Sequence, residues 1–223
     1  PQLSKSVYLK KKDKILQIQN KALELSMFLS LPASAALFVG SEEIISALFG
    51  YGSFNNEAVS NSAKALYYFG LGLPAFALIK VFSTFFFANN DTKTPFYISL
   101  VSVILNIFIS VYYFKNIGFI IIPIATSISS WFNSIILFIY LKNRNLFQFN
   151  QIFWTKFFKI LFTSILMGVF FKYLISIFGN QLAYDFNFKS FYLILSVLLC
   201  LIFYFLVSLF IKAFNSKDLH LKY

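Results

Sequence analysis

Six long apolar windows constrain this 223-residue chain more than any other feature. A helix needs about 20 apolar residues to cross the hydrocarbon core of a bilayer. Windows of that length with few charges lie at approximately 20–40, 63–88, 94–114, 117–140, 154–178 and 191–211. These runs are far too long and continuous for alternating barrel strands, and backbone polar groups in lipid must be satisfied within the segment. The sequence therefore predicts an all-α, polytopic membrane protein with six transmembrane helices.

The composition excludes an ordinary soluble domain. Hydrophobic residues make up 59% of the chain and charged residues only 12%, whereas soluble domains are about 25% charged. The net charge is +11, and in so apolar a chain we expect this excess to orient helices in a membrane rather than to bind nucleic acid. Cys200 lies inside an apolar run, where we expect it to be a small buried hydrophobe.

Lysine and arginine are unevenly distributed between the two predicted sides of the membrane. Thirteen lie on the side that carries both ends of the chain, and four lie on the other side: Lys64, Lys115, Lys172 and Lys189. Cytoplasmic segments carry the excess of Lys and Arg. We therefore expect both ends of this segment to be cytoplasmic.

Polar connectors separate the windows. Asn55 or Asn56 is expected to cap the second helix. In the connector 89–95, Thr94 is expected to cap the third helix, with Pro95 in its first turn. The connector 115–118 is so short that the third and fourth helices must be antiparallel neighbours.

Two lysines within or beside the windows are candidate substrate-binding residues. A charge in the middle of a span costs roughly 2.5–3.5 kcal/mol, and Lys80 lies deeper in the second window than a boundary residue needs to lie. Lys80 either lines a wet cavity and meets an anionic substrate, or extends to the headgroups. Lys21 and Glu24 are spaced to pair at the entrance of the first helix.

Other polar and helix-breaking residues favour close helix packing. Asn106 and Asn133 are expected to form hydrogen bonds between helices. Pro32, Pro74 and Pro123 predict kinks, which suit packing or the bending of a transporter.

Enzyme chemistry finds little support in the sequence. The only histidine, His220, lies in the polar C-terminal tail, and Asp91 and Asp185 are predicted on opposite sides of the membrane. A histidine dyad, a paired-carboxylate site and a metal cluster within the spans are therefore not expected. No glycine-rich phosphate loop occurs. We expect no catalytic residue, no metal and no cofactor.

One stretch resembles a known family. Residues 77–95, which contain Lys80 and end in Asp91-Thr92-Lys93-Thr94-Pro95, resemble the signature of the MurJ/MviN family of lipid II flippases. Three further pieces occur in that family's order: residues 1–5, a Leu-Pro motif containing Pro32 at 31–34, and a Leu-Phe-x-x-Gly-x-Phe loop at 48–54.

This resemblance implies a place within a longer, two-lobed transporter. Family members are similar in having roughly fourteen helices, in two lobes of six and one appended pair. The chain resembles their C-terminal portion, so we expect a basic cytoplasmic segment at 1–19, four helices of the C-terminal lobe at 20–141 and a cytoplasmic loop at 142–153. Two appended helices at 154–211 and a cytoplasmic tail at 212–223 would follow.

The resemblance also implies a function. Such a protein flips lipid II, the undecaprenyl-pyrophosphate-linked peptidoglycan precursor, across the bacterial cytoplasmic (inner) membrane, and its partners are lipid II, membrane lipids and the missing N-terminal lobe. Lys21 and Lys80 are the expected substrate contacts, and Pro32 and residues 91–95 the structural motif. Glu24 stands where the family carries an essential arginine, and Asn89 where many members have arginine.

Four alternatives stay open at this point. Within the same superfamily, the chain could belong to a flippase for another polyprenyl-linked oligosaccharide or to a cation-coupled drug exporter. Outside it, the chain could be a membrane scaffold or an inactive fragment, because half a transporter has no second lobe to rock against.

Overall fold

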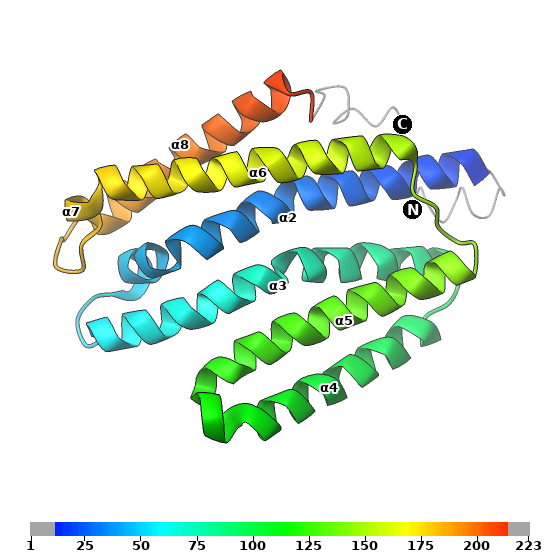
Figure 1. The fold of residues 1–223 in the computed structure, drawn as a ribbon, viewed down its shortest axis with the longest axis horizontal. Helices are drawn as coiled ribbons and strands as arrows, with labels where there is room; N and C mark the ends of the chain where they lie inside the picture. Colours follow the sequence, from blue (N-terminus) through cyan, green and yellow to red (C-terminus); the bar gives the residue numbers. More distant parts are fainter. Residues whose placement is uncertain (1–11, 214–223) are drawn as a thin grey trace. The chain divides into compact units, whose positions relative to one another are not determined.

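The described part of the chain, residues 12–213 of a computed structural model, consists of helices joined by short connections and contains no strand (Figure 1). With the labels of Figure 1, the helices are α2 (Lys12–Phe49), α3 (Asn56–Ala88), α4 (Lys93–Ile117), the 3-10 segment η1 (Gly118–Ile120), α5 (Ile121–Asn143), α6 (Gln151–Ile177), α7 (Gly179–Leu182) and α8 (Lys189–Phe210).

The six apolar windows are helical over nearly all of their length, which confirms the predicted all-α fold class. Five continuous helical stretches of the described residues are long and apolar enough to cross a membrane. One of them, Lys93–Asn143, contains both α4 and α5. The predicted polytopic helical architecture is therefore confirmed, with five candidate spans, the longest of which holds two of the six predicted windows.

The helix ends differ from the windows where the sequence becomes polar. The first helix continues beyond the predicted end at Gly40 to Phe49, and Gly40 itself has non-helical angles (φ −119°, ψ 25°). A Cβ at Gly40 would overlap the ring of Phe171 in α6, so a glycine fits this close helix contact. Polar residues past this kink, including Glu42 and Glu43, thus extend α2 instead of forming a loop.

The chain divides into two compact units, and α2 and α3 contribute to both. The first unit comprises residues up to Ser30 together with Gly72–Thr155, and the second comprises Leu31–Leu71 together with the residues from Lys156 onward.

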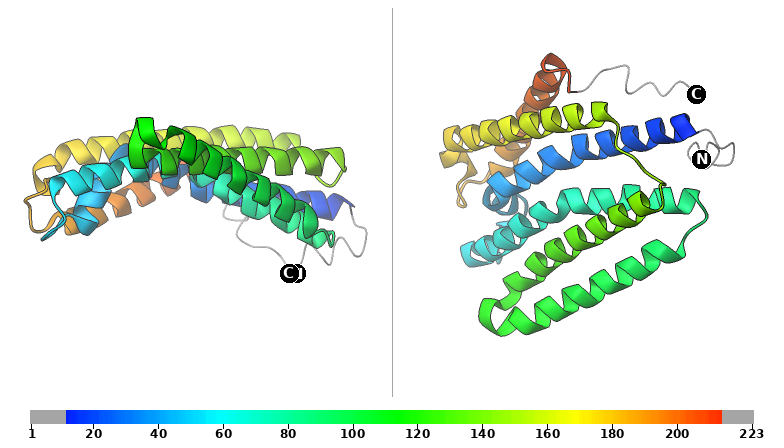
Figure 2. Two further views of the ribbon diagram at one scale, coloured as in Figure 1. Left: turned by 90° about the horizontal axis from the view of Figure 1, so that it is seen from below. Right: turned by 45° about the vertical axis from the view of Figure 1, so that its right-hand side comes forward.

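In the first unit, α4 and α5 form the predicted antiparallel hairpin, which reverses at η1 (Figure 2). The turn needs Gly118, whose φ of +73° is rare for residues with a Cβ. The side-chain amide of Asn106 donates to the Thr126 hydroxyl at 3.0 Å, and that of Asn133 donates to the Ser99 hydroxyl at 3.3 Å. The predicted hydrogen bonds between helices are therefore confirmed for both asparagines.

In the second unit, glycines let helices approach closely. A Cβ added to Gly70 of α3 would lie 2.8 Å from the Leu37 Cβ of α2. The Ser34 hydroxyl of α2 donates to the Gly70 carbonyl at 2.7 Å. Helices α6 and α8 are joined by stacked rings of Phe170 and Phe203, whose centroids are 4.4 Å apart. Small residues and hydroxyls of this kind are typical of helix contacts in membranes.

Candidate functional site

The connector between α3 and α4 is organised by a single carboxylate. Asp91 accepts the backbone N–H of Thr94 at 2.9 Å through Oδ1 and the Thr94 hydroxyl at 2.6 Å through Oδ2. The helix begins at Lys93, and Thr92 before it makes no side-chain capping bond. The prediction that Thr94 caps the helix is therefore wrong. Asp91 does so, because an aspartate three residues ahead of an unpaired N–H reaches it directly.

Arg144 ties the end of α5 to this connector. Its Nη1 lies 2.5 Å from Asp91 Oδ2. Partial burial acts to raise the pKa of the Asp91 carboxyl, but hydrogen bonds from Thr94 and the Arg144 charge outweigh it, so the pKa lies below its usual value. The sequence signal that could have identified this partner is that Arg144 is the only arginine of the chain.

The loop between α5 and α6 is fastened to the N-terminal part of α2. The Gln19 side chain donates to the Leu146 carbonyl at 2.9 Å. The Asn20 amide nitrogen donates to the Gln148 carbonyl at 3.0 Å, and its Oδ1 accepts the Asn150 N–H at 3.0 Å. Two consecutive side chains thus satisfy backbone groups across a whole loop, which we call the 144–150 strap.

An aromatic cluster fills the space beneath this strap. Phe147 is 1% exposed. Its ring stacks on Phe85 of α3 at 5.7 Å and meets Phe82, Phe138 and Phe149 at 6.3, 6.2 and 4.8 Å. Aromatic pairs at these separations contribute about 0.5–1.5 kcal/mol each beyond the area they bury. The strap is therefore held both by hydrogen bonds and by a buried side chain.

The two predicted substrate-binding lysines both belong to the first unit. Lys21 on α2 is half-buried, immediately after the asparagine that holds the strap. Lys80 on α3 is exposed and makes no hydrogen bond or ion pair with the residues described. Lys80 lies eight residues before the end of α3, which corresponds to about 12 Å along the axis.

The predicted structural-motif residues are distributed over both units. Thr92 and Lys93 are exposed, and Pro95 is buried in the first turn of α4, as expected. Pro32 is buried within α2 in the second unit.

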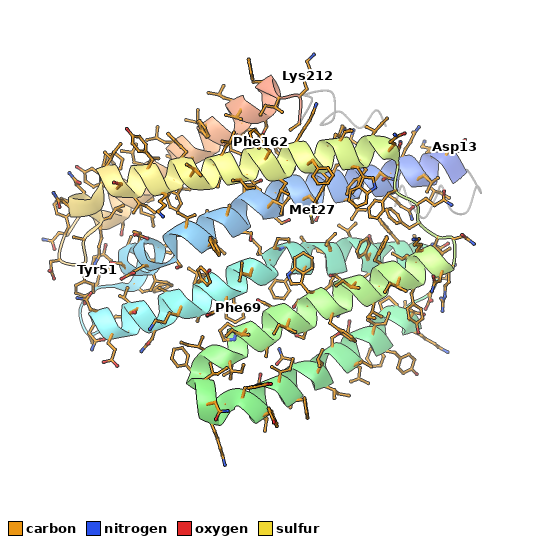
Figure 3. All side chains as sticks on the ribbon, in the orientation of Figure 1. Asp13, Met27, Tyr51, Phe69, Phe162 and Lys212 are labelled. Carbon is orange, nitrogen blue, oxygen red and sulfur yellow. The ribbon has the colours of Figure 1, made fainter. Side chains whose placement is uncertain are left out.

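The start of α8 is held in place by a buried lysine, Lys189, that the sequence analysis does not single out. Lys189 is 1% exposed. Its ammonium donates to the carbonyls of Gly50 and Tyr184, each at 2.5 Å, and lies 4.3 Å and 4.4 Å from the ring centroids of Tyr51 and Tyr184. Tyr51, labelled in Figure 3, follows α2, so this lysine joins the α2–α3 connection to the start of α8. We call Gly50, Tyr51, Tyr184 and Lys189 the lysine cage.

Two smaller predictions are settled and two lie outside the structure. Asn55 Oδ1 accepts the Ala58 N–H at 2.9 Å, which confirms the cap of α3. Cys200 is buried in α8 and unpaired, as expected of a small hydrophobe. The motif at 1–5 and His220 lie outside the described residues.

Known proteins are similar to this chain over most of its length. The family model described as lipid II flippase MurJ matches residues 1–195. A probable lipid II flippase MurJ from Rickettsia prowazekii is 38% identical over 124 residues, which are 56% of this chain and 24% of the relative. One from Rhizobium meliloti is 37% identical over 138 residues, which are 62% of this chain and 26% of the relative.

A solved structure shares the fold. The inward closed conformation of lipid II flippase MurJ has a TM-score of 0.73 and 24% sequence identity, and the match covers 94% of this chain and 41% of that one. The chain thus spans about a quarter of the length of these curated relatives and less than half of that structure. Because the family model covers residues 1–195 and apolar helices dominate the described part, this chain is a multi-pass membrane protein that belongs to the lipid II flippase MurJ family.

Proposed function

We propose that this chain is part of a transporter that moves lipid II across the cytoplasmic membrane for peptidoglycan synthesis. The family match over residues 1–195 is the observation that carries the proposal. The names of the relatives favour this cargo over another polyprenyl-linked oligosaccharide or a drug. No bond is made or broken in such a step, so the protein is a transporter and not an enzyme.

In this proposal, lysines of the first unit attract the pyrophosphate of the cargo. Lys80 is exposed on an apolar helix and its charge is not neutralised by any described neighbour, which is costly unless water or an anionic ligand reaches it. Lys21 supplies a second positive charge from α2. A lysine acts on phosphate as a point charge, without the bidentate fork of arginine. The lipid tail remains in the bilayer while rocking of the lobes re-exposes the headgroup on the other side.

The orientation follows the distribution of basic residues. Both ends of this segment are cytoplasmic, so the Asp91–Arg144 pair and the 144–150 strap face the cytoplasm and the lysine cage faces outward. Residues 20–141 belong to the C-terminal lobe, 142–153 form a cytoplasmic loop, and 154–211 are the appended pair, between a basic segment at 1–19 and a tail at 212–223. Pro32 and residues 91–95 position the lobe helices.

A charge-removal experiment tests the proposal. In a complete protein that carries this sequence, Lys80→Ala is expected to abolish rescue of cells depleted of their own flippase, with lipid II accumulating on the inner side. Lys64→Ala is the matched control, because Lys64 is also an exposed lysine of α3. Normal growth and normal lipid II export with Lys80→Ala would remove Lys80 from the mechanism. Failure of the unmodified complete protein to export lipid II would remove the proposed cargo.

A further inference from the structure

The second unit contains an acidic cavity that the proposed transport step does not use. The cavity has a volume of about 200 Å³ and lies where the end of α2 faces α7 and the start of α3. Glu42 and Glu43 line it, together with Ser46 one turn further along α2. These are consecutive carboxylates in a chain whose net charge is +11. The cavity is therefore acidic although the chain as a whole is basic.

Neither carboxylate is neutralised within the described part of the chain. No ion pair joins Glu42 or Glu43 to a described lysine or arginine. The ammonium group of Lys189 donates to two carbonyls and lies over two aromatic rings. Tyr184 lines the cavity and donates its hydroxyl to the Phe54 carbonyl at 2.8 Å. Two carboxyl groups thus line the cavity without a cationic partner among the described residues.

A buried hydroxyl at the cavity lacks a partner as well. Ser46 is 5% exposed, and its Oγ makes no hydrogen bond with the residues described. A serine buried in a helix can donate to the carbonyl three or four residues earlier, as Ser164 does to Ile160 at 2.7 Å. A buried polar group without a partner is costly. The pair of carboxylates and this hydroxyl together form an incomplete polar site.

The other residues that line the cavity favour an organic cation over a metal ion. The described residues contain no group of three or more His, Cys, Asp or Glu side chains that could hold a metal ion, and a calcium ion takes six to eight oxygen ligands. The apolar side chains of Val59, Ile175 and Leu182 also line the cavity. Space for several water molecules, beside an apolar wall and two carboxylates, suits an alkylammonium group better than a bare ion.

We propose that this cavity binds a primary ammonium group. Glu42 and Glu43 accept hydrogen bonds from the ammonium, and the Ser46 hydroxyl is a further acceptor. The apolar side chains of the lining contact the carbons attached to the nitrogen. Two sources offer this chemistry on a membrane surface: an ethanolamine lipid headgroup and an amino side chain of a peptide. The proposal does not depend on the identity of the transported lipid, because the site is defined by amine recognition alone.

The test measures binding of a fluorescent primary amine, monodansylcadaverine, to the 223-residue chain in bilayer discs of phosphatidylglycerol. Its N-acetylated form has the same fluorophore and stem without the charge, and it reports partition into lipid. We expect Glu42→Gln/Glu43→Gln to weaken binding of the amine at least about tenfold, as for loss of a charge-assisted hydrogen bond. Ser46→Ala should weaken it less, and the acetylated probe should show no saturable binding.

Glu57→Gln is the matched control, because Glu57 is an exposed carboxylate of the same unit and does not line the cavity. It should leave binding unchanged. The glutamines are near-isosteric with the glutamates, and circular dichroism of the variants checks that the helices are retained. Equal binding by the wild type and the double variant, or saturable binding of the acetylated probe, would overturn the proposal.

Competition identifies the source. Displacement of the probe by lyso-phosphatidylethanolamine, but not by a lysine-containing peptide, assigns the site to a lipid headgroup, and the reverse result assigns it to a peptide amine. Displacement by neither compound would also overturn the proposal, since each presents the ammonium group that the site is expected to recognise.

Discussion

Asp91 shows how one side chain can serve two parts of the first unit. It caps α4 through Thr94 and pairs with Arg144 after α5. In Asp91→Asn the Oδ1 acceptor for the helix cap is kept, but an NH₂ group faces the Thr94 hydroxyl and the guanidinium. We expect this variant to unfold at lower temperature in detergent, with a loss of about 1 kcal/mol at pH 7. Asp185→Asn, at an exposed aspartate of the other unit, should unfold like the wild type.

The same carboxylate predicts a pH dependence with a definite sign. The pKa of Asp91 is lower in the folded protein than its ordinary value. Its contribution to stability is therefore present above the ordinary value and is lost as pH falls through the lowered pKa. Melting temperatures of the wild type and Asp91→Asn should converge as the pH is lowered below 3.8, the ordinary value for this group. A gap that stays constant as the pH falls well below 3.8 would show that Asp91 does not act through its charge.

At the scale of elements, the 144–150 strap is a loop that is held by side-chain hydrogen bonds and by one buried ring, Phe147. Removing the Asn20 side chain takes away the acceptor of the Asn150 N–H. In Asn20→Ala, we expect hydrogen exchange at the Asn150 amide to speed up about fivefold, as for the loss of about 1 kcal/mol of local stability. Asn180→Ala, at an exposed asparagine of α7, should leave this amide unchanged. Unaltered exchange in Asn20→Ala would mean that Gln19 and Phe147 hold the strap without the Asn20 hydrogen bonds.

Helix contacts in the second unit predict opposite changes in stability when two glycines, Gly70 and Gly168, are replaced by alanine. An added Cβ at Gly70 would overlap the Leu37 Cβ at 2.8 Å, whereas at Gly168 it would meet the Ala35 Cβ at an ordinary 3.5 Å. Gly70→Ala is expected to destabilise the protein, since overpacking costs about 1–3 kcal/mol. Gly168→Ala should stabilise it by up to about 1 kcal/mol through helix propensity. Thermal unfolding of both variants checks the pair, and equal shifts would contradict the close contact at Gly70.

The elements that were predictable from sequence are those defined by local patterns. A membrane span is set by the length of an apolar run, so all six windows could be recognised. The Asp91–Arg144 pair, the strap and the lysine cage depend on partners that are far apart in the chain. Gln19 and Leu146 are separated by 127 residues, and Lys189 and Gly50 by 139. No periodicity links such positions, so the sequence identifies Lys189 only as one of four basic residues on its side. For the two candidate substrate lysines, the residue type and the position along the helix follow from the sequence, and their function stays a prediction.

At the scale of the whole molecule, the chain corresponds to only part of its relatives. The solved structure that shares its fold is matched over 41% of its length. Rocking between two lobes requires both of them. We therefore expect the 223-residue chain alone in vesicles to leave fluorescent lipid II on its original side, and a complete protein containing it to move the lipid. Transport by the chain alone would show that one lobe suffices.

The lysine cage has a practical consequence for experiments on this protein. An amine that is 1% exposed and bound to two carbonyls cannot react with acylating reagents while the fold is intact. Lys172, an exposed lysine of α6, should be acetylated at once. The ratio of label at these two positions, read by mass spectrometry, is thus a footprint of the native state. Acetylation of Lys189 marks each molecule in which the contacts between α8 and the α2–α3 connection have opened.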